Sequence, residues 1–150
     1  MSKPAVSIFW FRRDLRIEDN TALYHALNSD LPVLLLFIFD SNILDDLEMD
    51  DPRVNFIHRE LLAINQHLKK HNSAVLILHG EPQKIWKELL SEYAIQQVFI
   101  NKDYEPYALQ RDKAIENLLT ANDIGFLSWK TLPKVIDPPA LAPNECLYLR

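Results

Sequence analysis

Short apolar runs alternate along this chain with segments of helical period, and this alternation restricts the possible folds more than any other feature of the sequence. The apolar runs have the length of strands, which we expect over residues 5–11, 33–39, 74–78, 97–100 and 124–127. Between them, apolar residues recur three or four positions apart. This spacing, with Asn20 as an N-cap and Pro82 in a first turn, predicts helices after residue 20 and over 53–71, 82–93 and 107–122.

The alternation predicts an α/β fold, in which βαβ units build a parallel sheet covered by helices on both sides. Right-handed crossovers favour a Rossmann-like, three-layer, doubly wound sheet of five strands in the order 3-2-1-4-5. We expect this domain to occupy residues 1–129. Residues 130–150 carry four of the nine prolines and no clear period, so we expect an extended tail or the start of an interdomain linker.

The composition argues against several classes of protein. Sixteen Lys and Arg against twenty-one Asp and Glu give a net charge of −5, so the chain alone is not expected to bind duplex DNA. No apolar run approaches the ~20 residues of a membrane helix, and no signal peptide is recognisable, so a cytoplasmic protein is predicted. Cys146 is the only cysteine, which excludes an intramolecular disulfide and a cysteine-based zinc site.

Two kinds of site are disfavoured by what the sequence lacks. Phosphate-binding loops need glycine where the backbone approaches phosphate, and the chain has only Gly80 and Gly125. His67 and His71 lie four positions apart on one helical face, but no third ligand accompanies them, so no metal site is predicted. No set of nucleophile, base and acid is recognisable either, and the chain by itself is not expected to catalyse a reaction.

The loops that follow the strands are the candidate sites, because ligands of a doubly wound sheet bind outside the carboxyl ends of its strands. The most highly charged segment is residues 9–23, FWFRRDLRIEDNTAL, with its charges at Arg12, Arg13, Asp14, Arg16, Glu18 and Asp19. Such a segment can form a solvated helix entry with internal ion pairs. It can also form a packed ion-pair network or an interdomain contact, because guanidinium groups pair well with carboxylates.

The same segment is similar, nearly residue for residue, to the opening strand, loop and helix of the DNA photolyase/cryptochrome family. Residues 51–57 (DPRVNFI) and 101–112 (NKDYEPYALQRD) resemble that family in order and spacing, and the likeness covers about residues 5–129. The resemblance implies an N-terminal antenna domain, a Rossmann-like sheet that can hold a light-harvesting chromophore. It also implies a following helical domain, absent from this sequence, that holds FAD and contacts UV-damaged DNA.

The resemblance further implies a chromophore pocket. In members with a deazaflavin antenna, loops before the second helix and after the fourth strand line the pocket, and the matching positions are Met49, Arg53, Asp103, Glu105 and Arg111. Carboxylates accept hydrogen bonds from ring or ribityl groups, arginines neutralise negative charge, and Met or a neighbour such as Phe37 covers a flat ring. The folate-type pocket has Asn-Glu where this chain has Tyr107–Ala108, which favours a deazaflavin. The alternative is that these charges are solvated or cap the next helix.

The function implied by the resemblance is that of a deoxyribodipyrimidine photolyase, a carbon–carbon lyase that repairs UV-induced pyrimidine dimers with light. Light captured by the antenna would pass to reduced FAD, which donates an electron to a flipped-out dimer. The implied partners are the protein's own FAD domain and, through it, damaged DNA, with no membrane and no metal. Two alternatives remain open: a cryptochrome signalling protein of the same architecture, and an unrelated nucleotide-binding α/β domain.

Overall fold

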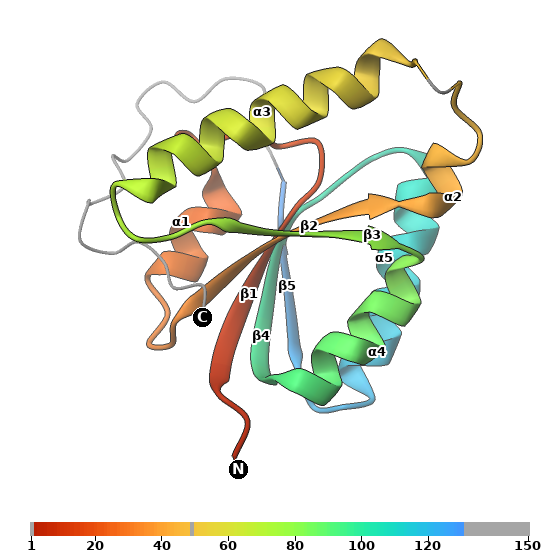
Figure 1. Ribbon diagram of the computed structural model, residues 1–150. Helices are drawn as coiled ribbons and strands as arrows, with labels where there is room; N and C mark the ends of the chain where they lie inside the picture. The colour runs from red at the N-terminus through yellow and green to blue at the C-terminus, as the bar shows by residue number, and fades with distance from the viewer. Residues whose placement is uncertain (1, 49, 131–150) are drawn as a thin grey trace.

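A five-stranded parallel sheet forms the centre of the molecule (Figure 1). The structure is a computed structural model that describes residues 2–48 and 50–130. Its strands are β1 (Ala5–Phe11), β2 (Val33–Asp40), β3 (Val75–Gly80), β4 (Ala94–Asn101) and β5 (Gly125–Trp129). They lie in the order β3-β2-β1-β4-β5 and all neighbouring pairs are parallel, so the predicted α/β class and strand order are confirmed.

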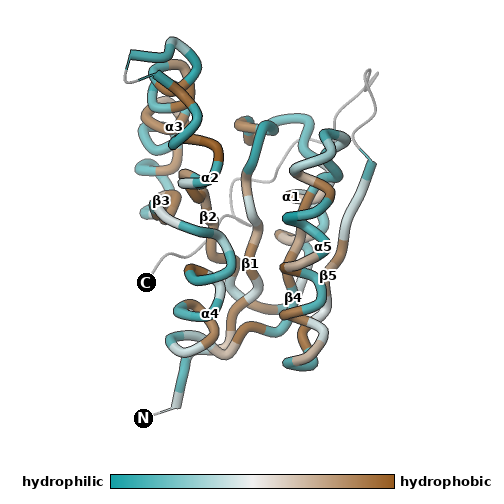
Figure 2. Tube along the Cα trace, turned by 90° about the vertical axis from the view of Figure 1, so that its right-hand side faces the viewer, coloured by the Kyte–Doolittle hydropathy of each residue, from teal (hydrophilic) through white to brown (hydrophobic). Residues whose placement is uncertain are grey.

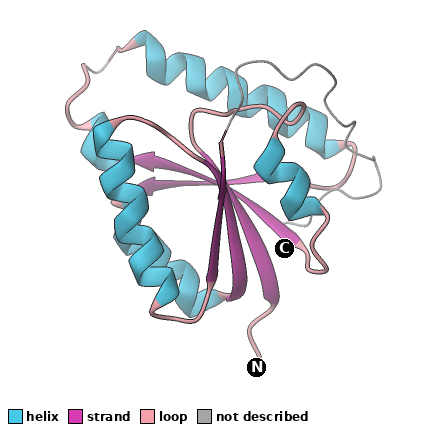
Figure 3. Ribbon diagram, turned by 180° about the vertical axis from the view of Figure 1, so that it is seen from behind, coloured by secondary structure: helices cyan, strands magenta, loops and turns pink. Residues whose placement is uncertain are grey.

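Helices cover both faces of this sheet, as Figures 1 and 3 show from opposite sides. On one face lie α1 (Thr21–Leu27) and α3 (Pro52–Lys69), and on the other lie α4 (Pro82–Glu92) and α5 (Pro106–Thr120). The chain therefore changes face between β3 and β4. The point where the strand order reverses lies beside β1, between β1 and β4.

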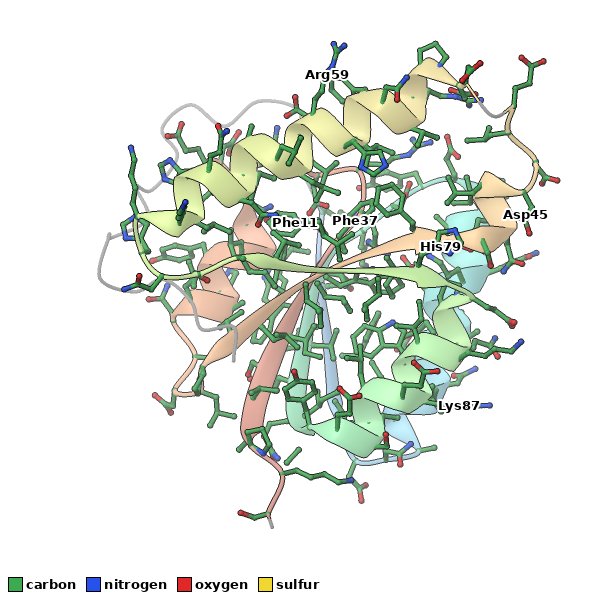
Figure 4. All side chains as sticks on the ribbon, viewed as in Figure 1. Phe11, Phe37, Asp45, Arg59, His79 and Lys87 are labelled. Carbon is green, nitrogen blue, oxygen red and sulfur yellow. The ribbon has the colours of Figure 1, made fainter. Side chains whose placement is uncertain are left out.

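Each central strand is apolar on both sides because each face of the sheet is buried under helices. In β1, Phe9 and Phe11 pack in the cluster under α1 and α3, whereas Ile8 and Trp10 pack in the cluster under α4 and α5. Figure 2 shows hydrophobic colours along the central strands, and Figure 4 places Phe11 and Phe37 between the sheet and α3. These two clusters form the core.

Several boundaries differ from the sequence prediction, most of them by one or two residues. β4 begins at Ala94 rather than at residue 97, because Gln96 and Gln97 are exposed and give no apolar signal although this part of the strand pairs with β1. β3 and β5 are edge strands that extend to Gly80 and Trp129, past the apolar runs that predicted them. A short helix, α2 (Ser41–Leu44), follows β2; a single turn has no period for a sequence pattern to reveal.

Candidate functional site

A cavity of about 520 Å³ opens at the carboxyl edge of the sheet. This volume is in the range of small-molecule sites. Segments far apart in the sequence build it: the ends of β1 and β2, α2, the first turns of α3, the loop after β4 and the first turns of α5. The lining residues include Trp10, Phe37, Phe39, Asp40, Leu47, Arg53, Val54, Ile57, Asp103, Glu105, Tyr107 and Arg111.

The deep wall of the cavity is aromatic. Phe37 and Phe39 come from alternate positions of β2 and meet edge to face, with ring centroids 4.9 Å apart. Trp10 comes from the other face of β1, and its ring contacts Trp86 edge to face at 5.5 Å. A wall of this kind suits a flat apolar or aromatic ligand.

One end of the cavity is polar and centres on Asp40 and Tyr107. The Tyr107 hydroxyl donates to Oδ2 of Asp40 at 2.6 Å and accepts from Nδ2 of Asn42 at 3.4 Å. The other carboxylate oxygen of Asp40 accepts the backbone N–H of Asn42 at 2.9 Å and so caps α2. Burial raises the pKa of Tyr107 above 10.0, and the hydrogen bond to Asp40 adds to this shift, so the phenol stays protonated at neutral pH.

Arg111 lies behind this pair with a side chain that is only 9% exposed. Its Nε donates to Oδ1 of Asp112 at 3.2 Å, and its Nη1 lies 3.8 Å from Oδ2 of Asp40. The guanidinium also lies over the Trp10 ring, with Cζ 5.1 Å from the ring centroid. Its Nη2 is buried and finds no hydrogen-bond partner among the described residues. A buried charged donor without an acceptor is costly, so the site is suited to a ligand that brings an acceptor there.

A buried polar network lies beside the cavity. Arg12 donates through Nη1 to Asp112 and through Nη2 to the carbonyl of Asn101. The Asn101 amide in turn donates to Oδ1 of Asn20 at 2.7 Å and to Asp14, and its Oδ1 accepts the backbone N–H of Ala22 at 3.1 Å. We call Arg12, Asp14, Asn20, Asn101 and Asp112 the edge network. It joins β1, α1, β4 and α5, so this part of the charged segment is a packed network.

Ion pairs of two exposed arginines, Arg13 and Arg53, lie at the rim of the cavity. Arg13 pairs with Glu105, and its Nε lies 3.9 Å from Oδ2 of Asp103; the Arg13 and Glu105 side chains are 67% and 58% exposed. On the opposite side, Arg53 Nη2 donates to Oδ2 of Asp51 at 2.7 Å. Asp51 also accepts the backbone N–H of Arg53 and caps α3. Hydrogen bonds from the Arg53 side chain and backbone lower the pKa of Asp51 from 3.8 to about 2.

Four of the five residues that the resemblance selected line this one cavity: Arg53, Asp103, Glu105 and Arg111. The fifth, Met49, lies outside the described residues. The alternative of a solvated helix face is wrong for Arg111, which is buried. Glu105 occupies the N-cap position of α5 without a side-chain hydrogen bond to the helix, a position at which a carboxylate can still interact with the helix macrodipole. Whether these four residues bind a chromophore stays a prediction.

Sequence reasoning named Phe37 of the deep wall, but it missed Trp10, Phe39 and the residues at the polar end. Asp40 ends β2 at the edge where ligands bind, which is the one signal that could have selected it. Tyr107 and Trp10 gave no such signal, since their role depends on contacts between β1, β2 and α5.

The described parts of the chain contain neither a cluster of metal-binding side chains nor a membrane-spanning helix. Within residues 2–48 and 50–130, no group of three or more metal-binding side chains comes together. In the same ranges, no helix has the length and apolar character needed to cross a membrane.

Comparison with known proteins identifies the family. The family model for DNA photolyase matches residues 7–141. The chain is 34% identical over 105 residues to the deoxyribodipyrimidine photo-lyase of Synechococcus sp. strain ATCC 27144, covering 70% of this chain and 22% of that protein. It is 30% identical over 114 residues to Cryptochrome-1 of Spalax judaei, covering 76% and 19%.

A solved structure agrees with the sequence matches. The archaeal photolyase of Sulfolobus tokodaii, a structure with two FAD molecules, superposes with a TM-score of 0.72 at 31% identity, over 83% of this chain and 29% of that one. The chain spans half or less of the length of the curated relatives that it matches. The match over most of the chain rules out an unrelated nucleotide-binding domain, and the protein belongs to the DNA photolyase family, whose members similar to it include both photolyases and cryptochromes.

Proposed function

We propose that this chain is the antenna domain of a DNA photolyase and that it binds a light-harvesting chromophore in the cavity at the carboxyl edge of the sheet. The observation that carries the proposal is the convergence of Arg53, Asp103, Glu105 and Arg111 on this one cavity. These residues come from two segments about fifty positions apart in the sequence: the first turn of α3, and the loop after β4 with the start of α5. The chain by itself is not catalytic.

The chemistry of the lining supports a flat ring with polar substituents. The ring would lie against Phe37 and Phe39, and an acceptor on it would meet the unpaired Nη2 of Arg111. At the rim, Asp103 and Glu105 can accept hydrogen bonds from ring N–H or ribityl hydroxyl groups, and Arg53 can approach a negative charge.

We favour a deazaflavin-type chromophore over a folate. The resemblance gives a folate pocket an Asn-Glu pair where this chain has Tyr107–Ala108, and here Tyr107 is already hydrogen-bonded to Asp40. The archaeal photolyase structure contains two FAD molecules. This supports a ring of flavin shape as a ligand in addition to the FAD that donates the electron.

The remaining parts of the repair reaction would lie outside this chain. We propose that FAD, the electron donor to the pyrimidine dimer, is held by a second domain of the full-length protein, and that this domain contacts damaged DNA. Residues 131–150 lie outside the described residues, and we propose that 130–150 lead toward that domain. We also propose a cytoplasmic location.

The decisive experiment uses the full-length protein. Its absorption spectrum should show FAD and a second chromophore, and blue light should convert cyclobutane dimers in an oligonucleotide to monomers. A bound antenna should extend the action spectrum of repair beyond the absorption of FAD. Repair with an action spectrum that follows FAD alone would contradict the antenna proposal.

A cryptochrome is the second candidate, favoured by the 30% identity to Cryptochrome-1 over most of this chain. The same experiment distinguishes the two functions. A cryptochrome would bind FAD and respond to blue light, but it would leave the dimers intact.

A further inference from the structure

Two aromatic side chains of the cavity, Trp10 and Tyr107, have opposite electrostatic surroundings. Both belong to residue types that can give an electron to a photoexcited ring. The charges next to each ring determine which of the two loses an electron more easily.

Trp10 lies next to two positive charges. The guanidinium carbon of Arg12 is 5.2 Å from the centroid of its ring and that of Arg111 is 5.1 Å away. The ring is buried at 1% exposure, so water screens these charges little. Asp112 pairs with both guanidinium groups and offsets part of their charge. Oxidation would create a further positive charge beside them, and the remaining repulsion opposes loss of an electron from Trp10.

Tyr107 has an anion as the nearest partner of its hydroxyl. Its O–H points at Oδ2 of Asp40 over 2.6 Å, a short charge-assisted hydrogen bond. Asp40 is held in place because its side chain is only 4% exposed and caps α2. Arg111 is farther from the phenol ring, with Cζ 5.9 Å from its centroid. A phenol that loses an electron becomes a strong acid, so a carboxylate already bound to the O–H accepts the proton without rearrangement.

We propose that Tyr107, with Asp40 as its proton acceptor, is the electron donor to a photoexcited oxidised flavin bound in this cavity, and that Trp10 is not. The inference rests on the proposed function, in that the cavity must hold a flat ring. In this step one electron passes from the phenol to the excited flavin, the O–H bond breaks, and the proton moves to Oδ2 of Asp40. The products are a neutral tyrosyl radical, a protonated Asp40 and a flavin reduced by one electron. When the electron and the proton return to Tyr107, the starting state is restored.

This step makes Tyr107 a specificity-determining residue. A pigment whose excited state oxidises phenols would lose its excitation to Tyr107 before passing energy on. The cavity therefore favours, as a light-harvesting pigment, a ring whose excited state is a weaker oxidant than an oxidised flavin.

Flavin mononucleotide bound to the full-length protein tests the inference. Equilibrium dialysis in the dark measures binding, and the fluorescence lifetime of the flavin in this cavity measures quenching. Tyr107→Phe should lengthen that lifetime several-fold. The matched control is Tyr104→Phe, in the loop just before α5, 64% exposed and outside the cavity lining, which should leave the lifetime unchanged.

Two further measurements separate proton-coupled transfer from simple contact quenching. Asp40→Asn keeps an oxygen that can cap α2 but removes the proton acceptor, so it should also lengthen the lifetime. Quenching in the wild-type protein should be slower in D₂O, and Asp40→Asn should abolish this isotope effect. In transient absorption, a tyrosyl radical should form as the excited flavin decays in the wild-type protein.

The outcomes distinguish the two proposals. Flavin that binds but keeps the same lifetime in Tyr107→Phe, or a tryptophan radical in place of the tyrosyl radical, would overturn this inference alone. Failure of flavin mononucleotide to bind in the dark would contradict the flat-ring cavity itself, and the inference with it.

Discussion

The edge network and the rim of the cavity both contain arginine–carboxylate pairs, yet they differ in burial and in the elements that they join. In the network, the Arg12 and Asp112 side chains are 6% and 12% exposed, and each polar group has its partner in another element of the fold. At the rim, Arg13 and Glu105 are mostly exposed, and their pairing joins two loops. Arginine–carboxylate pairs occur in both sets, so the type of charged residue does not distinguish them, although only the edge network contains asparagines, Asn20 and Asn101.

The difference shows that burial determines which arginine–carboxylate pairs stabilise the fold and which are free to bind a ligand. A buried ion pair cannot be broken cheaply, because the remaining charge stays in a medium of low dielectric. An exposed pair exchanges its partner for water at almost no cost. The edge network is therefore suited to hold β1, β4 and α5 in register, and the rim is free to exchange its internal pairs for a ligand.

The largest effect is expected from Arg12→Met, which leaves Oδ2 of Asp112 and the carbonyl of Asn101 buried without their donor, while Arg111 still donates to Oδ1 of Asp112. We expect a loss of about 3–5 kcal/mol in the free energy of unfolding, measured by urea denaturation. Arg13→Met, the neighbouring residue at the rim, should change it by less than about 0.5 kcal/mol. Equal losses in the two variants would remove the distinction between network and rim.

A smaller effect is expected from Asn101→Ala. Its amide bonds Asn20, Asp14 and the N–H of Ala22, and the loss should be about 1–3 kcal/mol for buried groups left without partners. The matched control is Asn122→Ala, an exposed amide that donates to the carbonyl of Leu118, and it should be nearly neutral. Thermal unfolding of both variants measures whether Asn101→Ala loses more stability than Asn122→Ala.

At the rim, Glu105→Ala should leave stability unchanged and weaken flavin mononucleotide binding roughly tenfold, as for one charge-assisted hydrogen bond. Titration calorimetry on the full-length protein measures the affinity. Glu116→Ala removes a comparable exposed carboxylate on α5, paired with Lys113, and should leave the affinity as it is. An equal loss in both variants would indicate a general charge effect.

The smallest effect concerns pH. Asp51 has a lowered pKa in the folded state, so its contribution to stability is present above its ordinary pKa of 3.8 and is lost as the pH falls through about 2. Arg53→Met removes the largest cause of the shift but keeps the backbone hydrogen bond, so the pKa should return only part of the way. An NMR titration of the carboxyl group measures this. An Asp51 that still titrates near pH 2 in the variant would assign the shift to the backbone.

The fold could be predicted from the sequence because β1 and β2 are apolar at all positions but Ser7 and Asp40 and the helices have clear periods. Their buried faces carry the signal that the pattern detects. The pattern gives no signal where a strand is only partly buried, as in the first half of β4, or where a helix is a single turn, as in α2. The predictable part is thus the part that apolar burial determines.

The candidate site could be predicted only through resemblance. No spacing relates Arg53 to Asp103, since the fold alone brings their loops to one edge of the sheet. The same limit applies to Tyr107, whose hydrogen bond to Asp40 spans 67 positions. The sequence showed the charges of residues 12–19 but not which of them are buried, because that depends on Asn101 and Asp112.

The strand order also determines what the growing polypeptide exposes during translation. β1, β2 and β3 are synthesised before α4, β4 and α5, and α1 with α3 can already cover one face of this half-sheet. The other face, which includes Ile8, Leu34 and Ile38, stays uncovered until α4 and α5 have been synthesised. This takes on the order of seconds at typical rates of synthesis. During that interval the central strand β1 also lacks its second neighbour. We expect the nascent chain to be most prone to aggregation and chaperone binding then, when an apolar face and an open strand edge are exposed together.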